Sequence, residues 1–158
     1  LTIDINTAFF RSLVDGADLL CEQVSSDPVA ETMTFHFDAP LPAGNGTLFL
    51  EYTGRMGEDM AGLYRSRYKG LRGREEVMAL TQFEAIDARR MLPCWDEPAR
   101  KATFSLTVII PADLTAVSNM PAAEEAFIGR GRRRVAFLET PRMSTYLLAL
   151  AVGRFDSV

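Results

Sequence analysis

The chain consists of short segments in which apolar and polar residues alternate, with turn-forming residues between them. In residues 103–110, every second residue is large and apolar: Phe104, Leu106, Val108 and Ile110. On a strand, this spacing places the apolar side chains on one face. The other expected strands are residues 32–37, 47–53, 62–68, 77–84, 114–118, 134–138 and 145–155. Many short strands separated by Gly and Pro predict an all-β fold, an antiparallel sandwich or barrel.

Helical periodicity is weak throughout. Residues 8–24 fit either a helix or a strand, and we interpret them as a strand. One short helical turn is expected within residues 85–91, beginning near Asp87. The basic residues 130–134 are expected at the tip of a hairpin, although a phosphate-binding patch is the alternative.

Composition excludes several classes of function. The 158 residues predict a single domain, and a net charge of −4 argues against a nucleic-acid partner. No stretch reaches the ~18 apolar residues of a membrane span, and the first residues show no signal peptide. Cys21 and Cys94 are far apart, as expected for thiols in a reducing compartment such as the cytoplasm.

The chain has one histidine, His36, so it cannot by itself form a zinc site that needs two or three histidines. His36 shares the polar face of its expected strand with Thr32 and Thr34. It is therefore expected to be a surface or cross-strand residue. We expect no metal site and no catalytic residue in this chain.

The residues that carry most functional information are 81–98. Gln82 and Glu84 stand two apart at the end of the strand expected at residues 77–84, so they share one face. An amide and a carboxylate side by side suit a cationic ligand, whereas a merely solvated strand end is the alternative.

The remainder of this segment is expected to form a rigid loop bounded by Pro93 and Pro98. Asp87 is placed to pair with one of the two arginines that follow it. We expect an ion-pair network to hold the loop, formed by Arg89, Arg90, Asp96 and Glu97. Trp95 and Pro93 are expected to pack the loop onto the sheet.

These motifs closely resemble the M1 zinc aminopeptidases. The matching motifs are TQFE at 81–84, DARR at 87–90, PCWDEP at 93–98, KATF at 101–104 and LTAVSNM at 114–120. GLYRSRY at 62–68 and TPRMSTYL at 140–147 are most similar to the puromycin-sensitive, cytosolic branch. The resemblance covers residues 62–158, whereas residues 1–60 match only in character.

The resemblance implies that residues 1–158 are the family's N-terminal domain, a twisted, saddle-like antiparallel β-sandwich. The family's Gly-Ala-Met-Glu-Asn motif and zinc-binding His-Glu-x-x-His helix lie further along the chain and do not occur here. Zinc would therefore belong to the full-length enzyme. The expected partners are a peptide substrate and the protein's own C-terminal catalytic domain.

The resemblance also implies a role for two residues. Glu84 would pair with the free α-ammonium group of the substrate, and Gln82 would hydrogen-bond the same end. Two alternatives stay open. One is a scaffold that has this fold without the chemistry, as in a transcription-initiation subunit, and the other is a free-standing β-sandwich that binds peptides or glycans.

Overall fold

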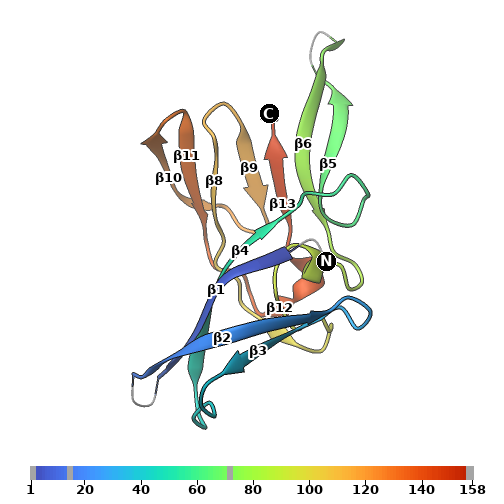
Figure 1. The fold of residues 1–158 in the computed structure, drawn as a ribbon. Coiled ribbons are helices and arrows are strands. Elements are labelled where there is room, and N and C mark those ends of the chain that lie inside the picture. The colour runs from blue at the N-terminus through green and yellow to red at the C-terminus, as the bar shows by residue number, and fades with distance from the viewer. Residues whose placement is uncertain (1–2, 14–15, 71–72, 156–158) are drawn as a thin grey trace. The chain divides into compact units, whose positions relative to one another are not determined.

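The structure, a computed structural model, describes residues 3–13, 16–70 and 73–155 (Figure 1). The fold is all-β, as predicted: the described strands pair antiparallel, with short 3-10 helices between some of them. The chain divides into two compact units, Leu1–Arg55 and Met56–Val158. The saddle shape and the assignment of all residues to one domain stay predictions.

The first unit is a four-stranded sheet in the order β3-β2-β1-β4. Its strands are β1 (Ile3–Ser12), β2 (Asp18–Asp27), β3 (Thr32–Phe37) and β4 (Gly46–Gly54). Residues 8–24, interpreted above as one strand, belong to two strands that pair antiparallel, with Phe10 opposite Leu19. Nε2 of His36 lies 2.9 Å from Oγ of Ser25 in β2, which confirms that His36 is a cross-strand residue.

The second unit contains two larger sheets, of orders β5-β6-β13-β9 and β10-β11-β8, and a small one of β7 and β12. The bounds are β5 (Gly62–Lys69), β6 (Glu75–Gln82), β7 (Lys101–Ala102), β8 (Thr107–Pro111), β9 (Thr115–Ser118), β10 (Ala122–Gly129), β11 (Arg132–Phe137), β12 (Met143–Ser144) and β13 (Leu150–Gly153).

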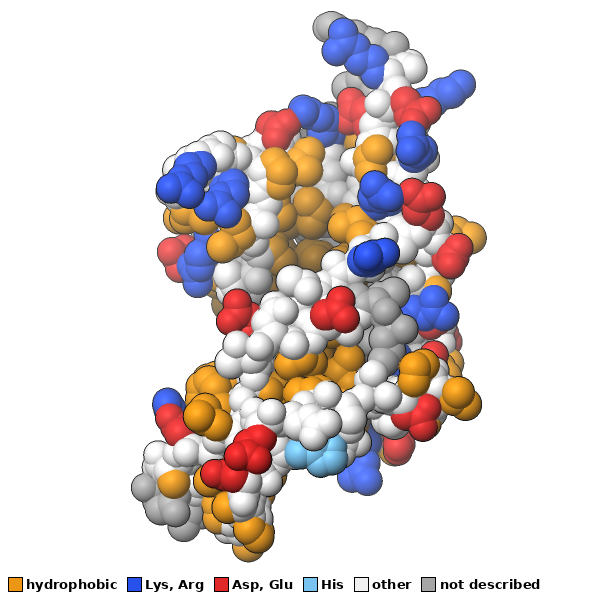
Figure 2. Space-filling model, viewed as in Figure 1, with side chains coloured by type: hydrophobic (Ala, Val, Ile, Leu, Met, Phe, Trp, Pro, Cys, Tyr) orange, Lys and Arg blue, Asp and Glu red, His pale blue; other side chains and the backbone are white. Residues whose placement is uncertain are grey.

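The two larger sheets of this unit pack against each other as a sandwich. Ile110, Val135 and Phe137 of the three-stranded sheet form a buried cluster with Ala116 of β9, and Val152 of β13 packs against it. Hydrophobic side chains gather in the hollow between β8 and the β5–β6 hairpin, with charged side chains around it (Figure 2).

Arg130 and Gly131 separate β10 from β11, so the basic run starts at a hairpin tip as expected.

Two expected strands are shorter than their patterns indicate. Residues 103–106 lie outside β8, although the strand was expected at 103–110, because Phe104 forms two hydrogen bonds with Thr140. The N–H of Phe104 donates to Oγ1 of Thr140, and the N–H of Thr140 donates to the carbonyl of Phe104. The strand expected at 145–155 begins with 3-10 helix η3 (Thr145–Leu147) and becomes β13 only at Leu150. Leu148, which lies between η3 and β13, packs with Phe83 and Ala88 in a second buried cluster.

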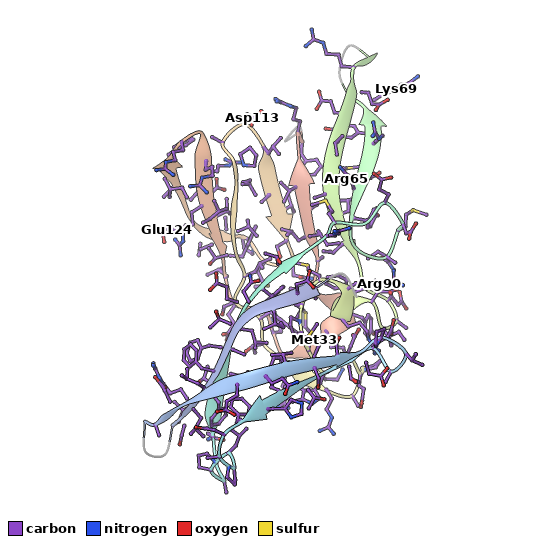
Figure 3. All side chains as sticks on the ribbon, in the orientation of Figure 1. Met33, Arg65, Lys69, Arg90, Asp113 and Glu124 are labelled. Atoms are coloured by element: carbon purple, nitrogen blue, oxygen red, sulfur yellow. The ribbon has the colours of Figure 1, made fainter. Side chains whose placement is uncertain are left out.

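Gly62, at the start of β5, is a position that only glycine fits. Its φ is +69°, and a Cβ atom there would lie 2.6 Å from Cβ of Arg90. Arg90 is labelled in Figure 3. Gly62→Ala should therefore lower the free energy of unfolding by about 3 kcal/mol, since left-handed strain and overpacking both act. Denaturant unfolding followed by circular dichroism measures this.

Gly131 provides the matched control, because its φ is +67° but nothing lies within 4 Å of an added Cβ. Gly131→Ala should cost about 1 kcal/mol, the left-handed strain alone. Equal losses in the two variants would contradict the close contact between Gly62 and Arg90.

Candidate functional site

The site lies where β6 ends. Gln82 still pairs with Gly62 of β5, but the ladder between β6 and β13 stops two residues earlier, at Leu80 and Ala151. Beyond that pair, the hydroxyl of Thr81 takes the place of a backbone acceptor: its Oγ1 accepts a hydrogen bond from the N–H of Leu150 at 2.8 Å. The expected strand 77–84 thus ends at Gln82, and Glu84 lies in the turn that follows.

Gln82 and Glu84 flank a buried aromatic residue. Phe83 is only 2% exposed and lies in the second cluster, whereas both of its neighbours are exposed. The Glu84–Ala85 peptide bond is cis. The amide of Gln82 and the carboxylate of Glu84 are thus exposed to solvent on either side of the buried Phe83 in sequence.

A short helix follows the turn and closes it. The N–H of Asp87 donates to the carbonyl of Phe83 at 2.9 Å, and 3-10 helix η2 (Ala88–Arg90) begins one residue later. The Asp87 carboxylate pairs with Nε of Arg90 at 2.6 Å. This confirms the helical turn near Asp87 and its pairing with a following arginine.

The carboxylate of Asp96 links this helix to the loop after it. Asp96 is 5% exposed, and its Oδ2 accepts from the backbone N–H of Arg89 at 3.0 Å and from Nε at 3.1 Å. Its Oδ1 accepts from the hydroxyl of Thr145, in η3, at 3.1 Å. Part of the predicted ion-pair network is thus present, but Thr145 was missed, because a contact across 49 positions leaves no local pattern.

The loop packs through different residues than expected. Leu92 and Cys94 pack against the cluster of Phe83 and Ala88, whereas Trp95 is 75% exposed, so its predicted packing role is wrong. Cys94 and Asp96 both turn inward, which leaves the residue between them facing outward. Burial raises the pKa of the Cys94 thiol to about 11, so it is protonated and unreactive near neutral pH.

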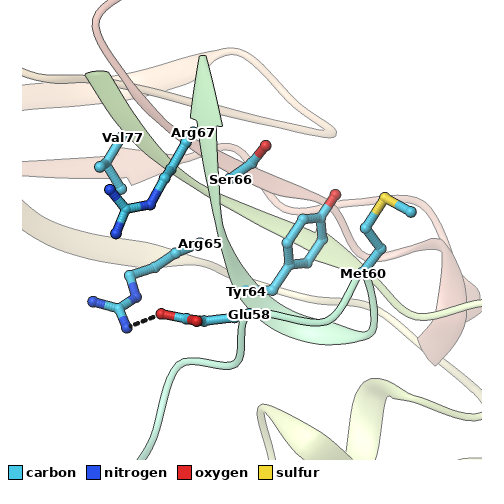
Figure 4. A pocket seen from close by; sticks show the side chains of 7 residues that line it. All are labelled: Glu58, Met60, Tyr64, Arg65, Ser66, Arg67 and Val77. Carbon is cyan, nitrogen blue, oxygen red and sulfur yellow. Dashed lines mark hydrogen bonds and ion pairs between the residues drawn. The ribbon is translucent and has the colours of Figure 1, made fainter. Parts of the chain in front are cut away.

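A separate shallow hollow of about 330 Å³ opens beside β5, and neither Gln82 nor Glu84 lines it (Figure 4). Its charges are balanced locally, since Arg65 pairs with Glu58 at 2.7 Å and Arg67 pairs with Glu75 at 2.5 Å. The hollow therefore offers no unpaired charge to a ligand, and the strand end remains the candidate site.

The described residues do not suit a zinc ion. No three His, Cys, Asp or Glu side chains among residues 3–13, 16–70 and 73–155 converge on a common point. No helix in this part of the chain has the length and hydropathy of a membrane span.

The fold and the site define an all-β domain that presents an amide and a carboxylate at one strand end. The family model for the peptidase M1 N-terminal domain matches residues 6–147. The chain therefore belongs to the peptidase M1 family, as an N-terminal domain. The match includes most of residues 1–60, which resembled the family only in character.

Curated relatives are named as aminopeptidases. The chain is 49% identical to aminopeptidase M1 of Arabidopsis thaliana over 128 residues, which is 81% of this chain and 14% of the relative. It is 48% identical to aminopeptidase M1-C of Oryza sativa subsp. japonica, with the same coverage of 81% and 14%. It is 47% identical to aminopeptidase N of Acetobacter pasteurianus, over 85% of this chain and 38% of the relative. The matched part of the chain thus spans well under half the length of these relatives.

Proposed function

We propose that this chain is the N-terminal domain of a zinc aminopeptidase, in which Glu84 and Gln82 bind the free α-amino group of a peptide. The observation that carries this proposal is the exposure of both side chains beside the buried Phe83, at the end of β6. The aminopeptidase names of the relatives support the peptidase over the scaffold alternative.

The chemistry of the two side chains suits this task. An ionised carboxylate accepts charge-assisted hydrogen bonds from an ammonium group, and an amide oxygen accepts another. An N-acylated peptide lacks the ammonium group and would leave the carboxylate unpaired. Recognition of this kind limits cleavage to one residue at a time from the amino terminus.

The rest of the protein must complete the site. Ion pairs between exposed groups contribute at most about 1 kcal/mol, because water and salt screen them. Glu84 is exposed in this chain, so strong binding requires a second surface that excludes water. The C-terminal catalytic domain is the proposed second surface, and its zinc would supply the activated water for hydrolysis.

The division of roles predicts where the metal is needed. The whole protein should hydrolyse leucine para-nitroanilide and lose nearly all activity in a chelator such as phenanthroline, with recovery on adding zinc. The isolated residues 1–158 should bind no equivalent of zinc and cleave no aminoacyl reporter. Metal content and release of para-nitroaniline measure both.

N-acetyl-leucine para-nitroanilide is the control, because acetylation turns the ammonium group into a neutral and bulkier amide. Equal hydrolysis of the two reporters, or activity that persists in the chelator, would contradict the proposal.

A cytoplasmic location and the lack of a nucleic-acid or membrane partner stay predictions.

A further inference from the structure

The buried carboxylate of Asp96 joins three segments of the second unit. Its two oxygens accept from the backbone and side chain of Arg89 in η2 and from the hydroxyl of Thr145 in η3. The backbone carbonyl of Asp96 also accepts from Nη2 of Arg89 at 3.3 Å. The position of η2 therefore depends on a residue in the loop and on its support from η3.

Asp96 also does what a capping residue ordinarily does. The N-cap position of η2 is Asp87, which makes no side-chain capping bond and pairs with Arg90 instead. The first N–H groups of a helix have no partner within it. The N–H of Arg89 is satisfied by Asp96, seven positions further along the chain.

Stability alone does not account for this arrangement. Burying an ion pair costs several kcal/mol of desolvation, roughly what the attraction returns, and an apolar substitute of the same size is often as stable. Buried polar groups in some proteins instead select one conformation. A role in placing η2 accounts for a carboxylate here.

Glu84 lies in the turn whose far end is η2. The near end is anchored by Phe83, and Ala88, the first residue of η2, is 0% exposed in the same cluster. The bond from the N–H of Asp87 to the carbonyl of Phe83 closes the turn at 2.9 Å. A shift of η2 would therefore move the backbone that carries Glu84.

We infer that Asp96 is a positioning residue for Glu84, holding η2 and thereby the turn that presents the carboxylate to the substrate's ammonium group. This inference rests on the proposed function of Glu84. A displacement of about 1 Å in a binding group lowers the rate by one to two orders of magnitude. Asp96 would thus affect activity without contacting substrate.

A double-mutant cycle in the whole protein tests the inference. Asp96→Ala is combined with either wild-type Glu84 or Glu84→Ala, and kcat/KM for leucine para-nitroanilide is measured for each folded protein. With Glu84 present, Asp96→Ala should lower kcat/KM about tenfold, and with Glu84→Ala less than about twofold. Asp96→Asn keeps an acceptor for Arg89 and should restore kcat/KM to within about threefold of wild type.

Thr145→Val carries the same test should Asp96→Ala unfold at the assay temperature. It removes one bond to Asp96, whereas Thr140→Val, also buried, removes a bond to the N–H of Phe104 and serves as its control. Thr145→Val should lower kcat/KM about threefold with Glu84 present and have no effect with Glu84→Ala, and Thr140→Val should leave kcat/KM unchanged in both.

The outcomes separate the inference from the function on which it rests. An equal loss in both backgrounds, no loss in either, or equal effects of Thr145→Val and Thr140→Val would overturn the positioning role while Glu84 keeps its own. An unchanged kcat/KM for Glu84→Ala alone would overturn the proposed function, and the positioning role with it.

Discussion

Replacing Glu84 with alanine is expected to lower kcat/KM of the whole protein for peptides with a free amino terminus about 100-fold. A hydrogen bond to a charged group contributes roughly 1.5–3 kcal/mol, and each 1.4 kcal/mol is a factor of ten. The fold should be unaffected, because Glu84 is exposed and follows the last residue of β6. Steady-state kinetics with leucine para-nitroanilide and a thermal unfolding curve measure the two effects.

Glu97→Ala is the matched control, since Glu97 is an exposed carboxylate in the loop after η2. It should leave kcat/KM within about twofold of wild type, as expected for a surface charge that is not part of the proposed site. Gln82→Ala should lie between the two variants, because it removes a neutral hydrogen bond. Equal losses for Glu84→Ala and Glu97→Ala would indicate a general charge effect and remove Glu84 from the site.

Replacing Asp96 with alanine is expected to lower the free energy of unfolding by about 3 kcal/mol. The side chain of Asp96 is 2% exposed and that of Arg89 is 27% exposed. Losing one partner leaves the other charge in a poorly solvated place, which costs more than the pair itself contributes. The N–H of Arg89 and the hydroxyl of Thr145 would also lose their acceptor. Denaturant unfolding of the purified protein measures this loss.

Asp113→Ala is the control for burial, because it removes an ion pair in which both side chains are exposed. The side chains of Asp113 and Arg154 are 58% and 55% exposed, so their pair should contribute less than about 1 kcal/mol. A loss for Asp96→Ala as small as that for Asp113→Ala would show that the buried network does not hold the loop.

Alternation was enough to predict most of the strands. The expected strand at 32–37 is β3 to the residue. The one at 47–53 differs from β4 by one residue at each end, and those at 62–68 and 114–118 differ from β5 and β9 by one residue at one end. In β3 partly buried residues alternate with exposed ones, so the pattern of two follows burial directly. The short helical turn at η2 was also predicted, from Asp87 and the residues after it.

The errors come from contacts between residues far apart in sequence. The hydroxyl of Thr81 ends the ladder to β13, and Thr140 draws Phe104 out of its expected strand, although the residues around neither threonine point to these partners. Trp95 was expected to pack because it is large and apolar, but the inward turn of Cys94 and Asp96 leaves it in solvent. Periodicity carries no information on such partners.

The candidate site shows the same division. Gln82 and Glu84 were predicted from their spacing on one expected strand and from family motifs. Both side chains are exposed, but Glu84 lies in the turn after β6, so the prediction that they share one strand face is wrong. Asp96 was expected only in an ion-pair network, since neither its burial nor its bond to Thr145 follows from the loop sequence. The contacts around the turn that carries Glu84 join residues far apart in sequence, so they leave no local sequence pattern.

The most direct test of the role of Glu84 compares two reporters that differ in a single group. Leucine para-nitroanilide carries the α-ammonium group, and its 2-hydroxy counterpart carries a hydroxyl in the same place. The ratio of kcat/KM for these reporters should strongly favour the amine in the whole wild-type protein, and Glu84→Ala should lower this ratio by about tenfold or more. A ratio that is the same in wild type and Glu84→Ala would show that Glu84 does not recognise the ammonium group.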